Sequence, residues 1–433
     1  MFGIQQFEFK SDTMDTANEV FLVTDSTTRK WLVFSLCMLS YIFSGTASTL
    51  VSVYLPVAVP ELLKNNDLSD SIISESRLGE IGAYVNAMFL YGWMAGGLLF
   101  GVVSDRVGRI PSLAFVTILY GVGVCLVVFA PDWYSLMVIR FVTGMGVGGV
   151  LLISTVYISE IWDRQTRPVM LGILAVSFPV GIVAAGSLNL VFDYWREAFW
   201  LGVIPTITGA MILFVAPESP HWRLDKTSGN FKTERVFDRR NRYSLVTGSL
   251  IFGSVLIGLW GIFSWLPTWV QSLIPAGEDG QKERGIVMII LGVGGIIGGI
   301  ISGFLIKAVG GKNTLVITFL GCIVMCCFLF LTNRRFSEII YVEAGLLALC
   351  FGVSQGSLSS YIPELFPVSI RATATGFCFN IGRFFTATAV FFIGTLVTVL
   401  GGFGNALLVF SIPFVIALII TWFGRDDHHK SLS

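Results

Sequence analysis

The chain has 433 residues and a formal net charge of zero, with 54% hydrophobic and only 13% charged residues. Because a soluble domain usually carries about 25% charged residues, this composition argues against a soluble protein and predicts a membrane protein. The zero net charge also argues against a nucleic-acid-binding protein, which needs a basic surface.

The first 30 residues are polar and mixed in charge, so they lack the basic start and apolar core of a signal peptide. We expect residues 1–30 to form a cytoplasmic tail. Twelve apolar runs follow, most of them about 20 residues or longer, which is enough to cross roughly 30 Å of hydrocarbon as a helix. These predicted spans are 31–55, 81–103, 110–130, 133–157, 168–191, 195–215, 244–270, 285–307, 313–332, 338–361, 371–397 and 401–423.

Lys and Arg are distributed unevenly between the two sides of these spans. Of the 28 basic residues, 19 fall on the side of the termini, 7 fall on the other side, and two lie inside spans. The positive-inside rule therefore predicts that both termini are cytoplasmic. The polar stretch 217–243 divides the chain into two six-helix bundles, 31–216 and 244–423, and residues 424–433 form a second cytoplasmic tail. The predicted fold is an all-α membrane protein with twelve transmembrane helices.

Two motifs repeat between the halves. "YISEIWDRQTR" (157–167) matches "YIPELFPVSIR" (361–371) in its Tyr, Glu and Arg positions. "GVVSDRVGR" (101–109) returns in decayed form as "GFLIKAVGGK" (303–312), where Gly101 and Gly108 match Gly303 and Gly310. Two matched halves are typical of a transporter whose substrate site lies between them near the bilayer midplane.

The motif at 101–109 resembles the signature of the major facilitator superfamily (MFS) between its second and third helices. "RFVTGMGVGG" (140–149), "SEIWDRQTR" (159–167), "PESPHW" (217–222) and "PELFPVSIR" (363–371) resemble the branch that holds sugar porters, organic-ion transporters and aromatic-acid and sialate transporters. The resemblance covers residues 31–423. It implies a transporter that works by alternating access, as a monomer and without a cofactor or metal.

The resemblance also implies a gate on the cytoplasmic side. Asp105 would face the start of the span 371–397 and hold the two halves together when the site faces outward, whereas the plainer alternative is a solvated turn that only maintains topology. The acidic and basic residues of the repeated motifs would complete this gate. Its predicted members are Asp105, Arg106, Arg109, Glu160, Arg167, Glu364 and Arg371.

Charged residues inside a membrane are costly, so each is a candidate functional residue. Arg383 lies near the middle of its span, with Asn380 one turn away, and we expect both to contact substrate. Arg140 either binds substrate or forms a structural ion pair with a neighbouring helix. Glu343, nearer the outer edge, could pair with either Arg, carry a proton or reach toward the membrane surface.

Comparison with sugar porters shows two departures. The span 31–55 contains no acid, although proton-driven sugar porters carry an Asp in this helix that pairs with the Arg of the fourth helix. The seventh span reads "GLWGIFSWLPTWVQ" (258–271) in place of a Gln-rich stretch, and its "WLPT" resembles acid-transporting relatives. Trp260 could stack on a ring, while Trp265 and Trp269 are expected in an interfacial aromatic belt. Phe178 and Gln355 either line the central site or pack in the core.

These observations predict a secondary active transporter for a small organic anion such as a carboxylate, an aromatic acid or an acidic sugar, because a guanidinium binds carboxylates. Proton coupling, with Glu343 as the carrier, stays open, and the alternative is a facilitator or symporter of a neutral sugar or polyol. The three His residues all lie outside the spans, which argues against an enzyme. A channel and a non-transporting receptor are further alternatives. The predicted location is the bacterial inner membrane.

Overall fold

A computed structural model describes residues 27–64, 74–163, 165–220, 222–223, 237–239, 241–275, 277–367 and 370–423, and all regular structure in these ranges is helical. The first half contains α2 (Thr27–Lys64), α3 (Glu75–Val107), α4 (Arg109–Leu126), η1 (Val127–Phe129), α5 (Trp133–Ile161), α6 (Arg167–Val191), η2 (Glu197–Gly202) and α7 (Val203–Val215). The second half contains α9 (Arg242–Phe263), α10 (Leu266–Ser272), α11 (Gln281–Val309), α12 (Gly311–Thr332), α13 (Ile339–Glu364), α14 (Arg371–Phe391), α15 (Ile393–Leu400), α16 (Phe403–Val409) and α17 (Ile412–Phe423). The predicted tails lie largely outside the described residues.

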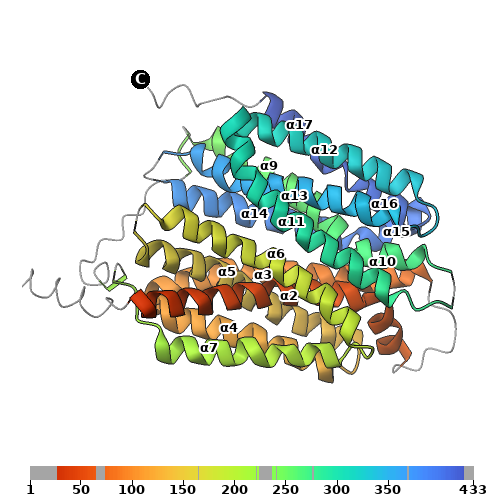
Figure 1. Ribbon diagram of the computed structural model, residues 1–433, viewed down its shortest axis with the longest axis horizontal. Helices are drawn as coiled ribbons and strands as arrows, with labels where there is room; N and C mark the ends of the chain where they lie inside the picture. The colour runs from red at the N-terminus through yellow and green to blue at the C-terminus, as the bar shows by residue number, and fades with distance from the viewer. Residues whose placement is uncertain are drawn as a thin grey trace, which may run out of the picture.

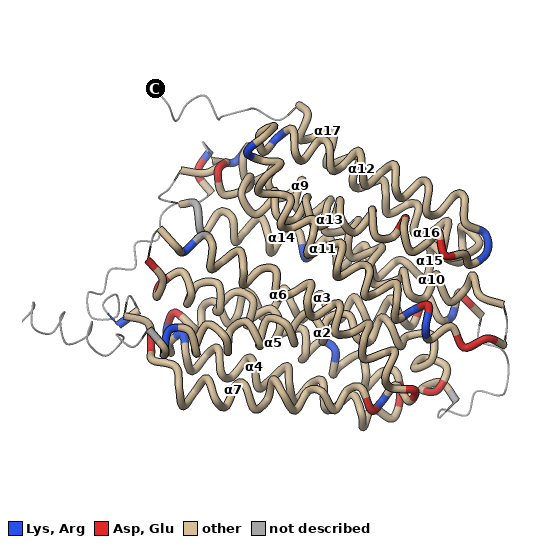
Figure 2. Tube along the Cα trace, in the orientation of Figure 1, with Lys and Arg blue, Asp and Glu red and all other residues tan. Residues whose placement is uncertain are grey.

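Among the described residues, eleven segments are long and apolar enough to cross a membrane, and a twelfth forms if α14 and α15, bent by 41° at their junction, are taken as one span. The helices run side by side, and charged residues gather at their two ends (Figure 2). The seventh span is α9 with α10, which are separated by a break just before Pro267. Proline is tolerated in the first turn of a helix because its missing N–H is unpaired there anyway.

The N-terminal helices form one bundle and the C-terminal helices form the other, side by side in Figure 1. We call the end where α2 begins and α17 ends the terminal face, and the other end the opposite face. Packing is matched between the bundles: α3 packs on α5 as α11 packs on α13, α2 on α6 as α9 on α14, and α4 on α7 as α12 on α17. This equivalence fits the predicted MFS fold.

The repeated glycines confirm the same correspondence at the level of the backbone. Gly108 separates α3 from α4 with φ of 127°, and Gly310 separates α11 from α12 with φ of 85°. Positive φ is strained for residues with a side chain, so both turns favour glycine. Gly101 instead lies within α3, where it lets Leu152 approach closely.

The bundles meet mainly through α6 with α11 and through α3 with α14 and α15, and a smaller contact joins α2 to α10. At the opposite face, Ser76 Oγ and Thr398 Oγ1 are 2.5 Å apart. A Cβ on Gly394 of α15 would lie 2.5 Å from Cα of Glu80 in α3, so these helices are in backbone contact. On the other side of the interface, Gln281 Nε2 donates to the carbonyl of Asn189 at 2.7 Å. The two halves are therefore joined along the opposite face.

Candidate functional site

The centre of the interface between the bundles holds a cluster of one cation and several aromatic rings, which we call the central cluster: Arg383, Asn380, Trp93, Trp260 and Phe178. Arg383 lies in the middle of α14 and is only partly buried. Its guanidinium carbon lies 5.4 Å from the centroid of the Trp93 ring, and its Nη1 is 3.5 Å from Oδ1 of Asn380. The predicted pair of Arg383 and Asn380 is thus brought together with an aromatic surface.

Both bundles contribute rings to the central cluster. Trp93 of α3 makes an edge contact with Trp260 of α9, with centroids 5.3 Å apart, and a tilted contact with Phe178 of α6 at 5.7 Å. Both indoles are buried. The four helices concerned, α3, α6, α9 and α14, all make contacts across the cluster. A ligand held there would therefore touch both halves of the molecule.

Two members of this region were missed by the sequence analysis. Trp93 stands in "YGWMAGG" (91–97), and an aromatic residue in an apolar span carries no signal of its own. Tyr41 of α2 lies near Arg383, and its hydroxyl is 3.0 Å from the carbonyl of Leu151 and 2.8 Å from Oγ1 of Thr155. The bonds to α5 hold the Tyr41 ring against the N-terminal bundle.

A cation beside ring faces suits a flat anion. A guanidinium binds a carboxylate through two parallel hydrogen bonds, and an indole offers an apolar face on which a conjugated or cyclic body can stack. Asn380 carries no charge, so its contact leaves the positive charge of Arg383 unbalanced. The central cluster can thus recognise both a carboxylate and the planar group attached to it.

Arg140 lies inside the N-terminal bundle, separate from these rings. Nη1 donates to the carbonyl of Ala47 at 2.7 Å and Nη2 to that of Ser48 at 3.2 Å, both in α2. The guanidinium carbon stacks 3.9 Å from the centroid of Phe89 in α3, and the side chain is 2% exposed. Arg140 therefore joins neighbouring helices as in the structural alternative, but through backbone carbonyls rather than through an acid.

Glu343 and Gln355 have no described contact with the central cluster. Glu343 Oε2 accepts a hydrogen bond from Asn333 Nδ2 at 2.6 Å, where α12 and α13 meet at the opposite face. Gln355 lies in α13 with its Nε2 buried and without a hydrogen-bond partner among the described residues. Proton transfer by Glu343 and substrate contact by Gln355 stay predictions.

The expectation of an interfacial belt at Trp265 and Trp269 is wrong, because both side chains are almost fully buried. Trp265 stacks on Phe403 with centroids 5.5 Å apart, and Trp269 meets Phe330 edge-on at 5.0 Å. Both indoles therefore face protein side chains. They anchor the end of the seventh span within the C-terminal bundle.

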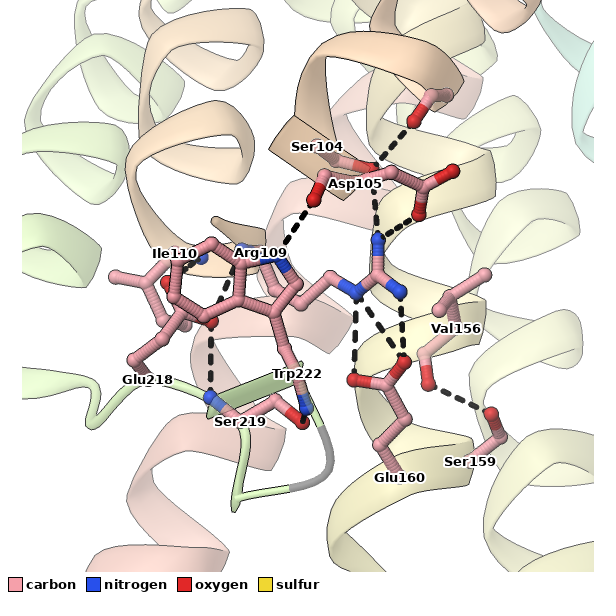
Figure 3. A network of polar contacts seen from close by, with 11 residues as sticks. Ser104, Asp105, Arg109, Ile110, Val156, Ser159, Glu160, Glu218, Ser219 and Trp222 are labelled. Atoms are coloured by element: carbon pink, nitrogen blue, oxygen red, sulfur yellow. Dashed lines mark hydrogen bonds and ion pairs between the residues drawn. The ribbon is translucent and has the colours of Figure 1, made fainter. Parts of the chain in front are cut away.

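A second polar network lies at the terminal face (Figure 3). We call it the terminal-face cluster: Asp105, Arg109, Glu160, Glu218 and Trp222. Arg109 pairs with Asp105 and, through Nη2, with Glu160 Oε1 at 3.0 Å. Glu218 accepts hydrogen bonds from the backbone N–H of Arg109 at 2.9 Å and of Ile110 at 3.2 Å. A carboxylate at the N-terminus of α4 is stabilised by the unpaired N–H groups and the helix dipole.

The same cluster attaches the described residues of "PESPHW", which are 217–220 and 222, to the N-terminal bundle. Trp222 Nε1 donates to the carbonyl of Asp105 at 2.8 Å, and the Tyr157 hydroxyl donates to that of Pro217 at 2.6 Å. A Cβ on Gly108 would lie 2.4 Å from Oε2 of Glu218. Gly108 is therefore needed for its φ angle and for the approach of Glu218, a residue that the sequence analysis did not single out.

The remaining predicted gate residues lie outside the terminal-face cluster. Arg167 donates to the carbonyl of Trp162 at 3.2 Å. Arg106 and Glu364 are exposed, and the side chain of Arg371 lies outside the described residues. The described ion pairs of Asp105, Arg109 and Glu160 stay within the N-terminal bundle. A contact between Asp105 and the start of α14 stays a prediction for the other conformation.

The chain is similar to known membrane transport proteins. The sequence profile described as Major Facilitator Superfamily matches residues 37–389. The cis,cis-muconate transport protein of Acinetobacter baylyi is 26% identical over 366 residues, which cover 81% of this chain and 87% of that protein. The sialic acid transporter NanX of Escherichia coli is 28% identical over 342 residues, covering 76% and 81%. The crystal structure of D-xylose-proton symporter superposes with a TM-score of 0.75 at 19% identity, covering 90% of this chain and 97% of that one.

Proposed function

This chain belongs to the major facilitator superfamily of membrane transporters, and we propose that it carries a small organic anion with a planar or cyclic body by alternating access. The proposal places substrate on the central cluster, with its carboxylate on Arg383 and its body against Trp93 and Trp260. The muconate and sialic acid transporters are relatives whose named substrates are carboxylates, which supports an anion.

The observation that carries this proposal is the placement of Arg383. A partly buried guanidinium lies halfway along a membrane-spanning helix, beside rings from both bundles, with the neutral Asn380 as its hydrogen-bond partner. Burying an unpaired cation costs free energy, and a carboxylate offsets that cost. A neutral sugar would leave the cation unpaired, so the anion is the better fit.

We place the terminal face in the cytoplasm, as the distribution of Lys and Arg predicts, and the chain in a bacterial inner membrane. The bundles touch along the opposite face, so the conformation described above would open Arg383 to the cytoplasm. The terminal-face cluster would close that side in the alternate state through Asp105 and the start of α14. Residues 31–216 and 244–423 would move as the two rocking units.

Substrate binding tests the role of Arg383. We expect cis,cis-muconate to raise the thermal unfolding midpoint of the purified protein, and Arg383→Gln to weaken its binding at least tenfold, since the charge-assisted hydrogen bonds are lost. The matched control is Arg335→Gln, an exposed residue at the opposite face. Calorimetry with cis,cis-muconate, sialic acid and D-xylose gives the measurement.

Two outcomes would contradict the proposal. Unchanged carboxylate affinity in Arg383→Gln would remove Arg383 from the site. Binding of D-xylose in preference to both carboxylates would favour the sugar alternative instead.

A further inference from the structure

We propose that this transporter works by anion exchange. The empty protein changes conformation slowly, and the site moves from one side of the membrane to the other only with an anion bound. The inference rests on the proposed function and adds the mode of transport. Its physical basis is the uncompensated charge of Arg383.

The described surroundings of Arg383 are an amide, aromatic rings and a phenol. The amide is that of Asn380, whose Oδ1 is 3.5 Å from Nη1 of Arg383. The centroid of the Trp93 ring is 5.4 Å from the guanidinium carbon, and the phenol is that of Tyr41. A phenol has an ordinary pKa near 10, so it is neutral at physiological pH. These groups solvate the guanidinium in part, and none neutralises it.

The described spans also lack an acid near their middle. Every Asp or Glu in a candidate span falls within six residues of an end of that span, where it can reach water or a headgroup. These residues are Glu61, Glu75, Glu80, Asp105, Glu160, Glu197, Glu283, Glu343 and Glu364. Some of these carboxylates have partners near the ends of the spans. Glu61 forms an ion pair with Arg196, and Glu343 accepts a hydrogen bond from Asn333. The described protein therefore holds no fixed counter-charge at the depth of Arg383.

This imbalance matters when the bundles move. Passing from one open state to the other requires an intermediate in which both faces are closed and water leaves the centre. An Arg that loses water without gaining an anion is strongly disfavoured. A substrate carboxylate supplies two charge-assisted hydrogen bonds and removes the penalty. The loaded protein should then reorient much faster than the empty one, which makes transport an exchange of one anion for another.

The first experiment uses the full chain in proteoliposomes with the same pH on both sides. Initial uptake of labelled cis,cis-muconate is compared between vesicles loaded with unlabelled muconate and empty vesicles. We expect at least tenfold faster uptake into the loaded vesicles. Equal rates would overturn exchange while leaving the anion carrier intact, and so would rapid uptake into empty vesicles driven by an imposed pH gradient. Failure to carry muconate or sialic acid, with D-xylose carried, would overturn both proposals.

A second experiment places the missing counter-charge in the protein. Asn380→Asp replaces the amide NH2 group by an oxygen and sets a carboxylate beside Arg383. We expect the variant to bind muconate at least tenfold more weakly and to lose the stimulation by internal anion, because its empty site is already neutral. Asn405→Asp, at an exposed position at the opposite face, is the control. Wild-type stimulation retained in a folded Asn380→Asp protein would contradict the proposal, and the loaded-versus-empty comparison decides it if that variant does not fold.

Discussion

At the scale of single residues, the two intramembrane arginines differ in what surrounds them. Arg140 is enclosed by helix carbonyls and the Phe89 ring, whereas Arg383 lies partly exposed between two bundles. A helix carbonyl has a second lone pair, so it can accept from Arg140 without losing its own helical bond. One arginine therefore joins the helices of a single bundle, and the other lies partly exposed where we propose that substrate binds.

This difference predicts opposite outcomes for the same conservative change. Arg140→Lys loses the planar fork that spans two carbonyls and the contact with Phe89, and we expect a loss of roughly 1–3 kcal/mol in stability. Muconate affinity should stay close to wild type in the folded fraction. Arg383→Lys should keep the unfolding midpoint and weaken muconate binding. Thermal unfolding in detergent and calorimetry on both variants test this, and a fall in affinity for Arg140→Lys would return that residue to the substrate site.

Residues of the site were predictable from sequence where their chemistry is unusual for a membrane. Arg383 stood out because a charge in the middle of an apolar run is rare, and Asn380 followed from the helical spacing. Trp93 and Tyr41 did not stand out, because rings are common in apolar spans and only the fold shows which ones meet. Trp265 and Trp269 were misplaced because their packing on Phe403 and Phe330 joins segments far apart in the sequence.

At the scale of elements, the turn between α3 and α4 is held by a residue from far along the chain. Glu218 places its carboxylate on the first N–H groups of α4, and Gly108 leaves the space for it. The equivalent turn at Gly310 has the same sign of φ, but a Cβ there would meet no atom within 4 Å. The repeated motif predicted both turns. It did not predict the tertiary contact of the Glu218 carboxylate with one of them, because Glu218 lies outside the motif.

The two turns therefore form a matched pair for mutation. Gly108→Ala and Gly310→Ala each introduce backbone strain of about 1–3 kcal/mol. Only Gly108→Ala also displaces Glu218, so we expect its unfolding midpoint to fall further than that of Gly310→Ala. Thermal unfolding of the two variants side by side is the measurement. Equal losses would show that Glu218 contributes little to holding the turn.

In the molecule as a whole, the contacts of the opposite face would define one end of the proposed transport cycle. Gln281 reaches across from α11 to the end of α6, and Ser76 reaches Thr398 between α3 and α15. Gln281 also borders a surface cavity of about 360 Å³ with Asp193 and Lys282. The two-bundle architecture was predictable from hydropathy and repeats. The face along which the bundles touch was not predictable, because the inward-open and outward-open conformations of a transporter would have the same sequence.

Cross-linking tests whether these contacts must open during transport. We expect a disulfide between Cys residues introduced by Ser76→Cys and Thr398→Cys to stop muconate exchange, and a reductant to restore it. Each single substitution should leave exchange near wild type in oxidising and reducing buffer. Full exchange by the oxidised double variant would show that the opposite face does not need to separate.

The attachment of Pro217, Glu218 and Trp222 to the first bundle has a consequence for dividing the gene. Through Tyr157, Arg109 and Asp105, the residues Pro217, Glu218 and Trp222 are bound to the N-terminal bundle, although their polar surroundings in the sequence assign them to the connector. If the chain were expressed as two fragments divided after Ala216, Glu218, which caps α4, would belong to the C-terminal fragment. A cut after Arg223 would leave each fragment with the side chains that complete its own turns.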